Sequence, residues 1–206
     1  MKINITTGIS KTGASIPCIN LPPVVTCRSD APCVKICYAL RGRFRFSNVK
    51  NSLDKNYEAY KQNPELFFGQ IDMYLKTNAF KHFRYHSSGD IPDETYLDYM
   101  CKTARKNKSV KFLCFTKKYE MINSYMEKHK TPGNLKIVLS NWGDFSCENP
   151  NDLPTAHIRF KETNTKTSSP FDGKANECSG YCGACVNTKN SCWNLRKGES
   201  VVFNQH

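Results

Sequence analysis

The sequence predicts an α/β protein, built on a parallel sheet like a partial (β/α) barrel, with loop-rich, cysteine-bearing segments at both ends. Between residues 47 and 160, short apolar runs alternate with stretches of helical periodicity, an order typical of parallel strands joined by crossover helices. Seven of the eleven cysteines lie in two short segments outside that region. A length of 206 residues with 39% hydrophobic residues suits one domain with one core.

The first part of this single domain, residues 1–46, contains four prolines and several glycines, and we expect it to be irregular. A helix is predicted from Ser47, because Val49, Leu53, Tyr57 and Tyr60 recur at helical spacing; Pro64 opens a second helix. The string KHFRYHSSGD (81–90) alternates and then ends in turn residues, which predicts a strand running into a loop.

The second part, up to residue 160, continues the alternation of helices and strands. A helix is predicted over 92–106, since its first turn is acidic and its last turn basic, matching the helix dipole. Another is expected over 119–130. The apolar runs SVKFLCFTKK (109–118), NLKIVLSNWG (134–143) and TAHIRF (155–160) are typical of buried parallel strands. In the last part, 161–206, we expect a loop over 161–177, then the cysteines, then a final strand SVVFNQ (200–205).

The formal net charge of +12 favours an anionic small molecule or a nucleic acid as partner, although charge that serves solubility alone remains an alternative. No run of about 18 apolar residues predicts a membrane span, and the first residues do not resemble a secretory signal. We therefore expect a cytoplasmic protein without a membrane partner. In a reducing cytosol, clustered cysteines serve metal ligation or catalysis better than disulfides.

The C-terminal cysteines have the spacing C-x3-C-x2-C-x6-C, formed by Cys178, Cys182, Cys185 and Cys192. Four thiolates saturate a tetrahedral zinc ion or hold a [4Fe-4S] cluster. The tight, unequal spacing favours a cluster, and the small residues between the cysteines let backbone amides approach the sulfur atoms. A zinc site that only ties down the C-terminal segment remains the alternative.

The N-terminal cysteines, Cys27, Cys33 and Cys37, have the spacing C-x5-C-x3-C and are followed directly by Tyr38. Three thiolates leave one coordination position open for water, substrate or cofactor, the pattern of a reactive centre. Cys18 or Cys147 would close the site if either supplied a fourth ligand. One or two clusters are therefore expected, and the two cysteine groups either form separate centres or share one.

Polar residues follow each predicted strand. They are His86, Ser87, Ser88, Gly89 and Asp90; Thr116, Lys117 and Lys118; Ser140, Asn141 and Trp142; and Arg159. Because the carboxyl ends of parallel strands meet at one edge of a sheet, we expect these residues to line one pocket. Each of them alone is consistent with an ordinary solvated loop.

The string RGRFRF (41–46) interleaves arginine with aromatic residues directly after the first cysteine group. Guanidinium groups suit phosphates, and phenylalanine rings stack on bases. An equally weighted alternative is a strand whose phenylalanines face the core and whose arginines are solvated.

The order of a three-cysteine loop, a helix, and a strand ending in Ser88-Gly89-Asp90 resembles the radical SAM superfamily. That superfamily usually spaces its cysteines C-x3-C-x2-C, a spacing found here only at Cys178, Cys182 and Cys185. The resemblance implies an iron–sulfur cluster at the N-terminal trio and S-adenosylmethionine bound by Tyr38, Ser87, Ser88, Gly89 and Asp90. Asp90 would pair with the ammonium group, and Asp90, Lys117 and Asn141 are the candidate catalytic residues.

The strings CYALRGRFRF, SSGDI, LCFTKK and CGAC…CW…VVFNQH also resemble a cysteine-rich protein family of phages and mobile elements, over roughly Cys18 to His206. This resemblance implies a phage-encoded protein of the host cytoplasm with one or two clusters.

The resulting hypothesis is an enzyme that cleaves S-adenosylmethionine, with electrons from an electron donor, to start radical chemistry on a nucleotide or nucleic acid. The alternatives are a nucleic-acid-binding protein stapled by zinc and an iron–sulfur redox regulator without catalysis.

Overall fold

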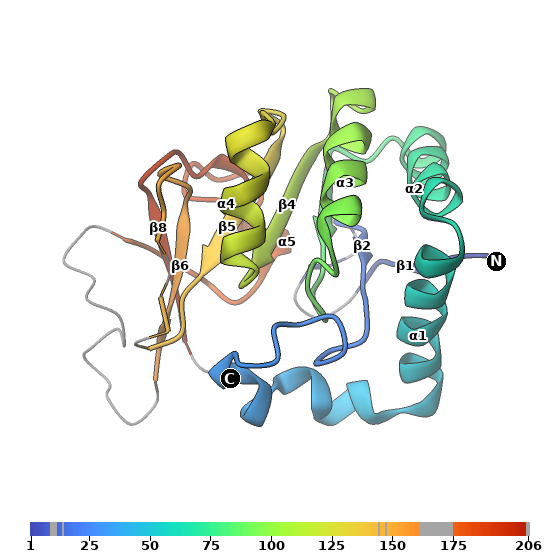
Figure 1. Cartoon of the computed structure of the whole chain (residues 1–206), viewed down its shortest axis with the longest axis horizontal. Coiled ribbons are helices and arrows are strands. Elements are labelled where there is room, and N and C mark those ends of the chain that lie inside the picture. The colour runs from blue at the N-terminus through green and yellow to red at the C-terminus, as the bar shows by residue number, and fades with distance from the viewer. Residues whose placement is uncertain (9–11, 14, 144, 147, 161–174, 205–206) are drawn as a thin grey trace.

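A computed structural model of the chain describes residues 1–8, 12–13, 15–143, 145–146, 148–160 and 175–204. In these ranges, eight strands form one open sheet in the order β1-β2-β3-β4-β5-β6-β8-β7 (Figure 1). Every neighbouring pair is parallel except β1 and β2. The predicted α/β class is confirmed, and the sheet does not close into a barrel.

The predicted helices and strands between residues 47 and 160 are present within a few residues of the expected bounds. The helices of the described ranges are α1 (Ser47–Gln62), α2 (Pro64–Asn78), α3 (Glu94–Lys106), α4 (Tyr119–Lys128) and the one-turn α5 (Cys182–Cys185). The strands are β1 (Ile5–Thr6), β2 (Cys18–Ile19), β3 (His82–Tyr85), β4 (Lys111–Thr116), β5 (Leu135–Ser140), β6 (Thr155–Arg159), β7 (Ala175–Glu177) and β8 (Ser200–Asn204).

Two helix starts carry the side-chain caps that explain their position. The side chain of Asn63 accepts a hydrogen bond from the Leu66 amide, and Pro64 occupies the first turn of α2, where no amide hydrogen is needed. Asp93 accepts from the Tyr96 amide in the same way and begins α3 there. These caps place α3 directly after the β3 loop, which carries Ser87–Asp90.

Towards the ends of the chain the structure contains short elements that the sequence did not predict. The opening segment is not irregular throughout, because it supplies β1, β2 and the 3-10 helices η1 (Pro32–Ile36), η2 (Tyr38–Leu40) and η3 (Gly42–Arg45). RGRFRF is therefore helical, and Phe46 is 59% exposed rather than in the core. The loop expected over 161–177 ends in β7, while residues 161–174 lie outside the described part. Strands of two or three residues are too short to leave a periodic pattern in the sequence.

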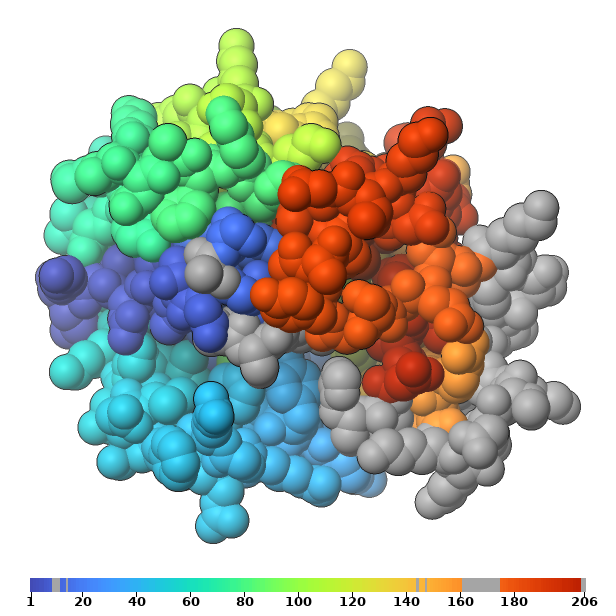
Figure 2. Space-filling model, turned by 180° about the vertical axis from the view of Figure 1, so that it is seen from behind, coloured from blue at the N-terminus to red at the C-terminus, as the bar shows by residue number. Residues whose placement is uncertain are grey.

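The sheet has two differently covered faces. Phe83, Tyr85 and Phe112 belong to the core that packs under α2, α3 and α4. Leu113 alternates with Phe112 along β4 and joins a second core with Ile16 and Trp193. The C-terminal cysteine segment thus covers the face opposite the long helices, and Figure 2 shows it beside the N-terminal segment on that side.

None of the helices in the described ranges combines the length and apolar character needed to cross a bilayer.

Candidate functional site

A cavity of about 230 Å³ lies at the carboxyl edge of the parallel strands, between the strand ends and the N-terminal cysteine segment. In Figure 1 that segment, in blue, runs along the lower edge of the sheet. The structure brings fourteen of the predicted site and pocket residues together as lining of this one cavity. They are Cys27, Cys33, Cys37, Tyr38, His86, Ser87, Ser88, Gly89, Asp90, Thr116, Lys117, Ser140, Asn141 and Trp142.

The loop after β3 is held in an unusual backbone conformation by Asn20, which follows β2. The Asn20 Oδ1 accepts hydrogen bonds from the amides of Ser87 at 2.7 Å and Ser88 at 3.1 Å. Gly89 has φ +81°, and a Cβ there would stand 2.7 Å from the Thr26 Oγ1 and 2.8 Å from the Leu21 carbonyl oxygen. Only glycine fits this position without strain, so the backbone of the loop approaches the cysteine segment closely.

Asp90 ties this loop to the end of β4. One carboxylate oxygen accepts from the Ile91 amide at 2.7 Å, and the other accepts from the Lys117 amide at 2.9 Å. Burial raises the pKa of Asp90, while these hydrogen bonds and the charge of Lys117 act in the opposite direction. The Thr116 side chain also hydrogen-bonds to the carboxylate, which therefore positions the loop and keeps one lone pair that is able to accept from a ligand.

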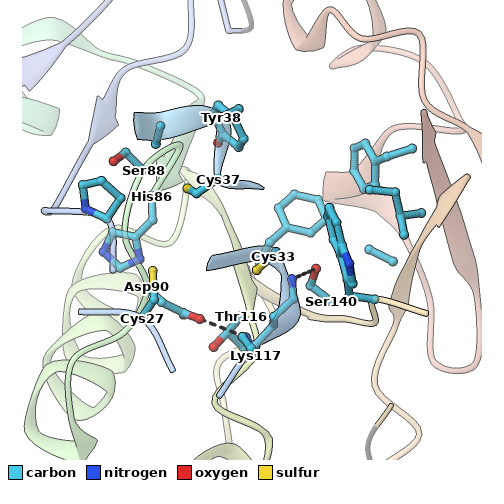
Figure 3. A pocket seen from close by; sticks show the side chains of 18 of the residues that line it. Cys27, Cys33, Cys37, Tyr38, His86, Ser88, Asp90, Thr116, Lys117 and Ser140 are labelled. Carbon is cyan, nitrogen blue, oxygen red and sulfur yellow. Dashed lines mark hydrogen bonds between the residues drawn. The ribbon is translucent and has the colours of Figure 1, made fainter. Parts of the chain in front are cut away.

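Lys117 carries a positive charge into the cavity. Its Nζ donates to the Ser140 Oγ at 2.8 Å and lies 5.8 Å from the centroid of the Trp142 ring (Figure 3). The predicted residues at the ends of β4 and β5 therefore lie next to one another. Arg159, which was expected at the same rim, instead forms an ion pair with Glu177 at 2.8 Å.

The three N-terminal thiols face the same space, as Figure 3 shows. Burial, with smaller contributions from the negative charges of Asp90 and Cys37, raises the pKa of Cys27 to about 11. Burial also raises the pKa of Cys33. The hydroxyl of the adjacent Tyr38 donates to the Ser87 carbonyl oxygen, which joins the cysteine segment to the β3 loop. Thiols in this setting are neutral at pH 7 unless a cation offsets the cost of the charge.

The four C-terminal cysteines gather on the other side of the sheet. Burial, with smaller contributions from the charges of Cys178 and Cys182, raises the pKa of Cys192 to about 12. Burial and the same two neighbours raise the pKa of Cys185. The Gly180 amide donates to the Cys178 sulfur at 3.3 Å, a contact of the kind expected for a glycine between ligands.

The ten described cysteines are all free. In the described ranges, no three His, Cys, Asp or Glu side chains stand close enough to hold a metal ion. Each group does supply neighbouring thiols, the donor type that zinc and iron–sulfur clusters prefer. Of the two residues considered as a fourth ligand for the N-terminal trio, Cys18 is buried beside Asn20, where the charges of Arg84 and Cys182 act on it. Cys147 lies outside the described residues.

Arg84 is the site residue that sequence reasoning missed. It is 5% exposed, its Nη1 lies 3.5 Å from the Cys182 sulfur, and its guanidinium carbon lies 5.2 Å from the Phe115 ring centroid. Within the described residues it makes no ion pair with a carboxylate, and its Nε has no hydrogen-bond partner. Burial lowers the pKa of Arg84, but the charges of Cys182, Cys18, Tyr38 and Cys192 together outweigh it and raise the pKa above the usual value.

Arg84 also lines the cavity, and it therefore stands between the two cysteine groups. The sequence did contain a signal for Arg84, because it is a lone cation between the aromatic residues Phe83 and Tyr85 of a predicted strand. Asn20 left no such signal, because its role depends on a loop almost 70 residues away.

Comparison with known proteins gives one match. Residues 2–177, more than four fifths of the chain, match the family model described as gene product 88. The match includes the cavity residues and the N-terminal trio and stops just before Cys178. No curated protein and no solved structure matches the chain.

Proposed function

Starting from the membership of this chain in the gene product 88 family, we propose that it is an iron–sulfur enzyme of radical SAM type. The observation that carries this proposal is the position of Cys27, Cys33 and Cys37. Three thiols face a cavity at the carboxyl edge of a parallel sheet, where α/β enzymes bind their ligands. The family description is consistent with a phage protein, which the sequence resemblance also implies.

In this proposal, Cys27, Cys33 and Cys37 hold a [4Fe-4S] cluster and leave one iron open. Their donor type fits, because three thiolates satisfy three of four irons, and burial, which raises the pKa of Cys27 and Cys33, favours their thiolates only beside a cation. Bound there and reduced by an electron donor, the cluster would supply the electron that splits S-adenosylmethionine into methionine and a carbon radical.

The protein itself binds and orients the reactants. Ser87, Ser88 and Gly89 present backbone to the cavity in a conformation that Asn20 and Tyr38 hold. Asp90 accepts from the ammonium group of S-adenosylmethionine with its remaining lone pair. Lys117, fixed by Ser140, attracts an anionic substrate, and Asn141 offers an amide at the same strand end.

We assign the C-terminal cysteines to a second centre with a different role. Cys178, Cys182, Cys185 and Cys192 supply four thiolates, which close the coordination of a cluster or a zinc ion. They belong to the segment that covers the sheet face opposite the long helices, so a centre there would hold that cover in place. Arg84 connects this centre to the cavity and offsets its negative charge.

The test begins with protein purified without oxygen. Iron and sulfide are counted per chain and the visible spectrum is recorded; about four irons indicate one cubane and about eight indicate two. Cys33→Ala should lose about four irons, while Cys101→Ala, a buried cysteine of α3 outside both groups, should lose none. Reduced protein should then release methionine from S-adenosylmethionine.

Three results count against the proposal. A colourless preparation with stoichiometric zinc would replace it with the zinc-stapled nucleic-acid-binding alternative. A fully loaded cluster without cleavage would leave a redox regulator. Loss of all iron in Cys33→Ala would indicate one shared centre instead of two.

A further inference from the structure

The exposed side chains of residues 35–46, called here the basic rim, form a surface at the mouth of the cavity. Within the described residues, six of the ten exposed large apolar side chains fall between residues 24 and 46. Phe46 is 59% exposed, Leu40 48% and Tyr38 43%. Tyr38 and Ile36 also line the cavity, so this surface is continuous with the site.

The charge of the basic rim has one sign. The sequence contains no acidic residue between Asp30 and Asp54, but five cations: Lys35, Arg41, Arg43, Arg45 and Lys50. All five are exposed, and none takes part in an ion pair within the described ranges. Four of the five cations belong to the basic rim, and Lys50 follows it in α1, so the rim concentrates positive charge without a nearby carboxylate beside the cavity.

The basic rim places rings and guanidinium groups together on a backbone of fixed shape. The 3-10 helices η2 and η3 carry it, and the buried Ala39 anchors it against the protein. The rings of Tyr38 and Phe44 meet edge to face with centroids 5.9 Å apart, while Phe46 projects from the last turn before α1. In Figure 1 this segment runs along the lower edge of the molecule into α1.

From this arrangement we propose that the basic rim binds single-stranded nucleic acid and presents it to the cavity. Phosphates would pair with Arg41, Arg43 and Arg45, and unstacked bases would lie on Phe46 and Tyr38. An acidic protein surface would satisfy the charges but not the exposed rings, and bases in a duplex are already stacked. That the bound nucleic acid is the enzyme's substrate rests on the proposed function. That the basic rim binds nucleic acid does not depend on it.

The test measures binding of a fluorescein-labelled 15-nucleotide oligothymidylate to the full, metal-replete protein by anisotropy, at several salt concentrations and without S-adenosylmethionine. Replacing Arg41, Arg43 and Arg45 together by Gln should flatten the slope of log K against log salt by about 2, since each phosphate contact on a single strand contributes about 0.7. Phe46→Ala should weaken binding roughly 5- to 150-fold, and Phe46→Tyr should restore it.

A charge-matched control replaces Lys76, Lys108 and Lys128 by Gln. These exposed cations lie at or just beyond the C-terminal ends of α2, α3 and α4, far from the carboxyl edge of the strands, and their loss should leave the slope unchanged. The proposal is overturned if both triple variants lower the slope equally, if polyglutamate of equal charge competes as well as the oligonucleotide, or if a 15-base-pair duplex binds as tightly. Binding to the basic rim needs no S-adenosylmethionine. If the protein binds the oligonucleotide but does not cleave S-adenosylmethionine, the proposed enzyme activity fails while this inference stands.

Discussion

If the C-terminal thiols hold the proposed metal centre, Arg84→Met should destabilise the loaded protein but not the metal-free protein. Methionine fills a similar volume but removes the buried charge that lies 3.5 Å from the Cys182 sulfur. In the metal-free, reduced protein the Cys192 and Cys18 thiols beside Arg84 are neutral, because burial raises the pKa of Cys192 to about 12 and also raises the pKa of Cys18. The guanidinium is then buried without an anion, and its removal should leave stability unchanged or raise it.

In protein that carries the proposed centre, the same cation would face thiolates. Removing one partner of a buried ion pair costs about 3–5 kcal/mol. Loss of the cation–π interaction with the Phe115 ring, whose centroid lies 5.2 Å from the guanidinium, costs at most about 2 kcal/mol more. At about 2–4 °C per kcal/mol for a chain of this size, the pair alone corresponds to a fall in Tm of roughly 6–20 °C. The same 3–5 kcal/mol weakens metal binding by roughly 10²- to 10⁴-fold.

The assay is thermal unfolding of wild type, Arg84→Met and Arg84→Lys, each as isolated without oxygen and after chelation under reducing conditions. Arg84→Lys keeps the charge and should lie between the other two proteins in the loaded state. If Arg84→Met loses the same stability in both states, the charge has no anionic partner at Cys182, and the account of Arg84 given above is refuted.

Three further predictions concern the cavity wall. Burial lowers the pKa of His86 to about 3, so below pH 6.5 the unfolded chain binds a proton that the folded protein does not. About 2–3 kcal/mol of stability should therefore be lost between pH 6.5 and 4.5. The variant His86→Asn, in which asparagine tolerates the left-handed φ of 59°, should lose this pH dependence when urea unfolding is measured at each pH. Gly89→Ala should cost clearly more in chemical denaturation than Gly42→Ala, because both have positive φ but only Gly89 lacks space for a Cβ; equal losses would show that the loop relaxes. Asn20→Ala leaves the Ser87 and Ser88 amides without their acceptor and should lower the free energy of unfolding by about 2–4 kcal/mol, whereas a loss below about 1 kcal/mol would mean that water replaces the side chain.

The sequence predicted the helices and long strands of the middle region well, because each buries a regular face. Leu53 and Tyr60 of α1 and Phe112 to Cys114 of β4 are buried as their spacing indicated. The short strands β1, β2 and β7 were missed, since two or three residues gain their stability from pairing with a distant strand. The 3-10 helices over residues 32–45 were missed for a related reason, as tight turns anchored by single residues such as Ala39 leave no repeating pattern.

Part of the candidate site followed from the order of elements alone. Once β3, β4 and β5 are parallel, Asp90, Lys117 and Asn141 must lie at the same edge, because right-handed crossovers return every strand in one direction. The sequence could not place the cysteines on this frame. That the N-terminal trio faces the cavity depends on Tyr38 reaching the Ser87 carbonyl oxygen, a contact between residues 49 apart.

By itself, then, the sequence determined the α/β class, the edge of the sheet where polar residues gather, and the two groups of thiols, since periodicity and spacing are local properties. Only the tertiary structure decided that one group faces the cavity, that the other covers the opposite face of the sheet, and that Arg84 stands between them. A buried cation is stable only beside an anion, and which anion that is depends on chain segments that come together on folding.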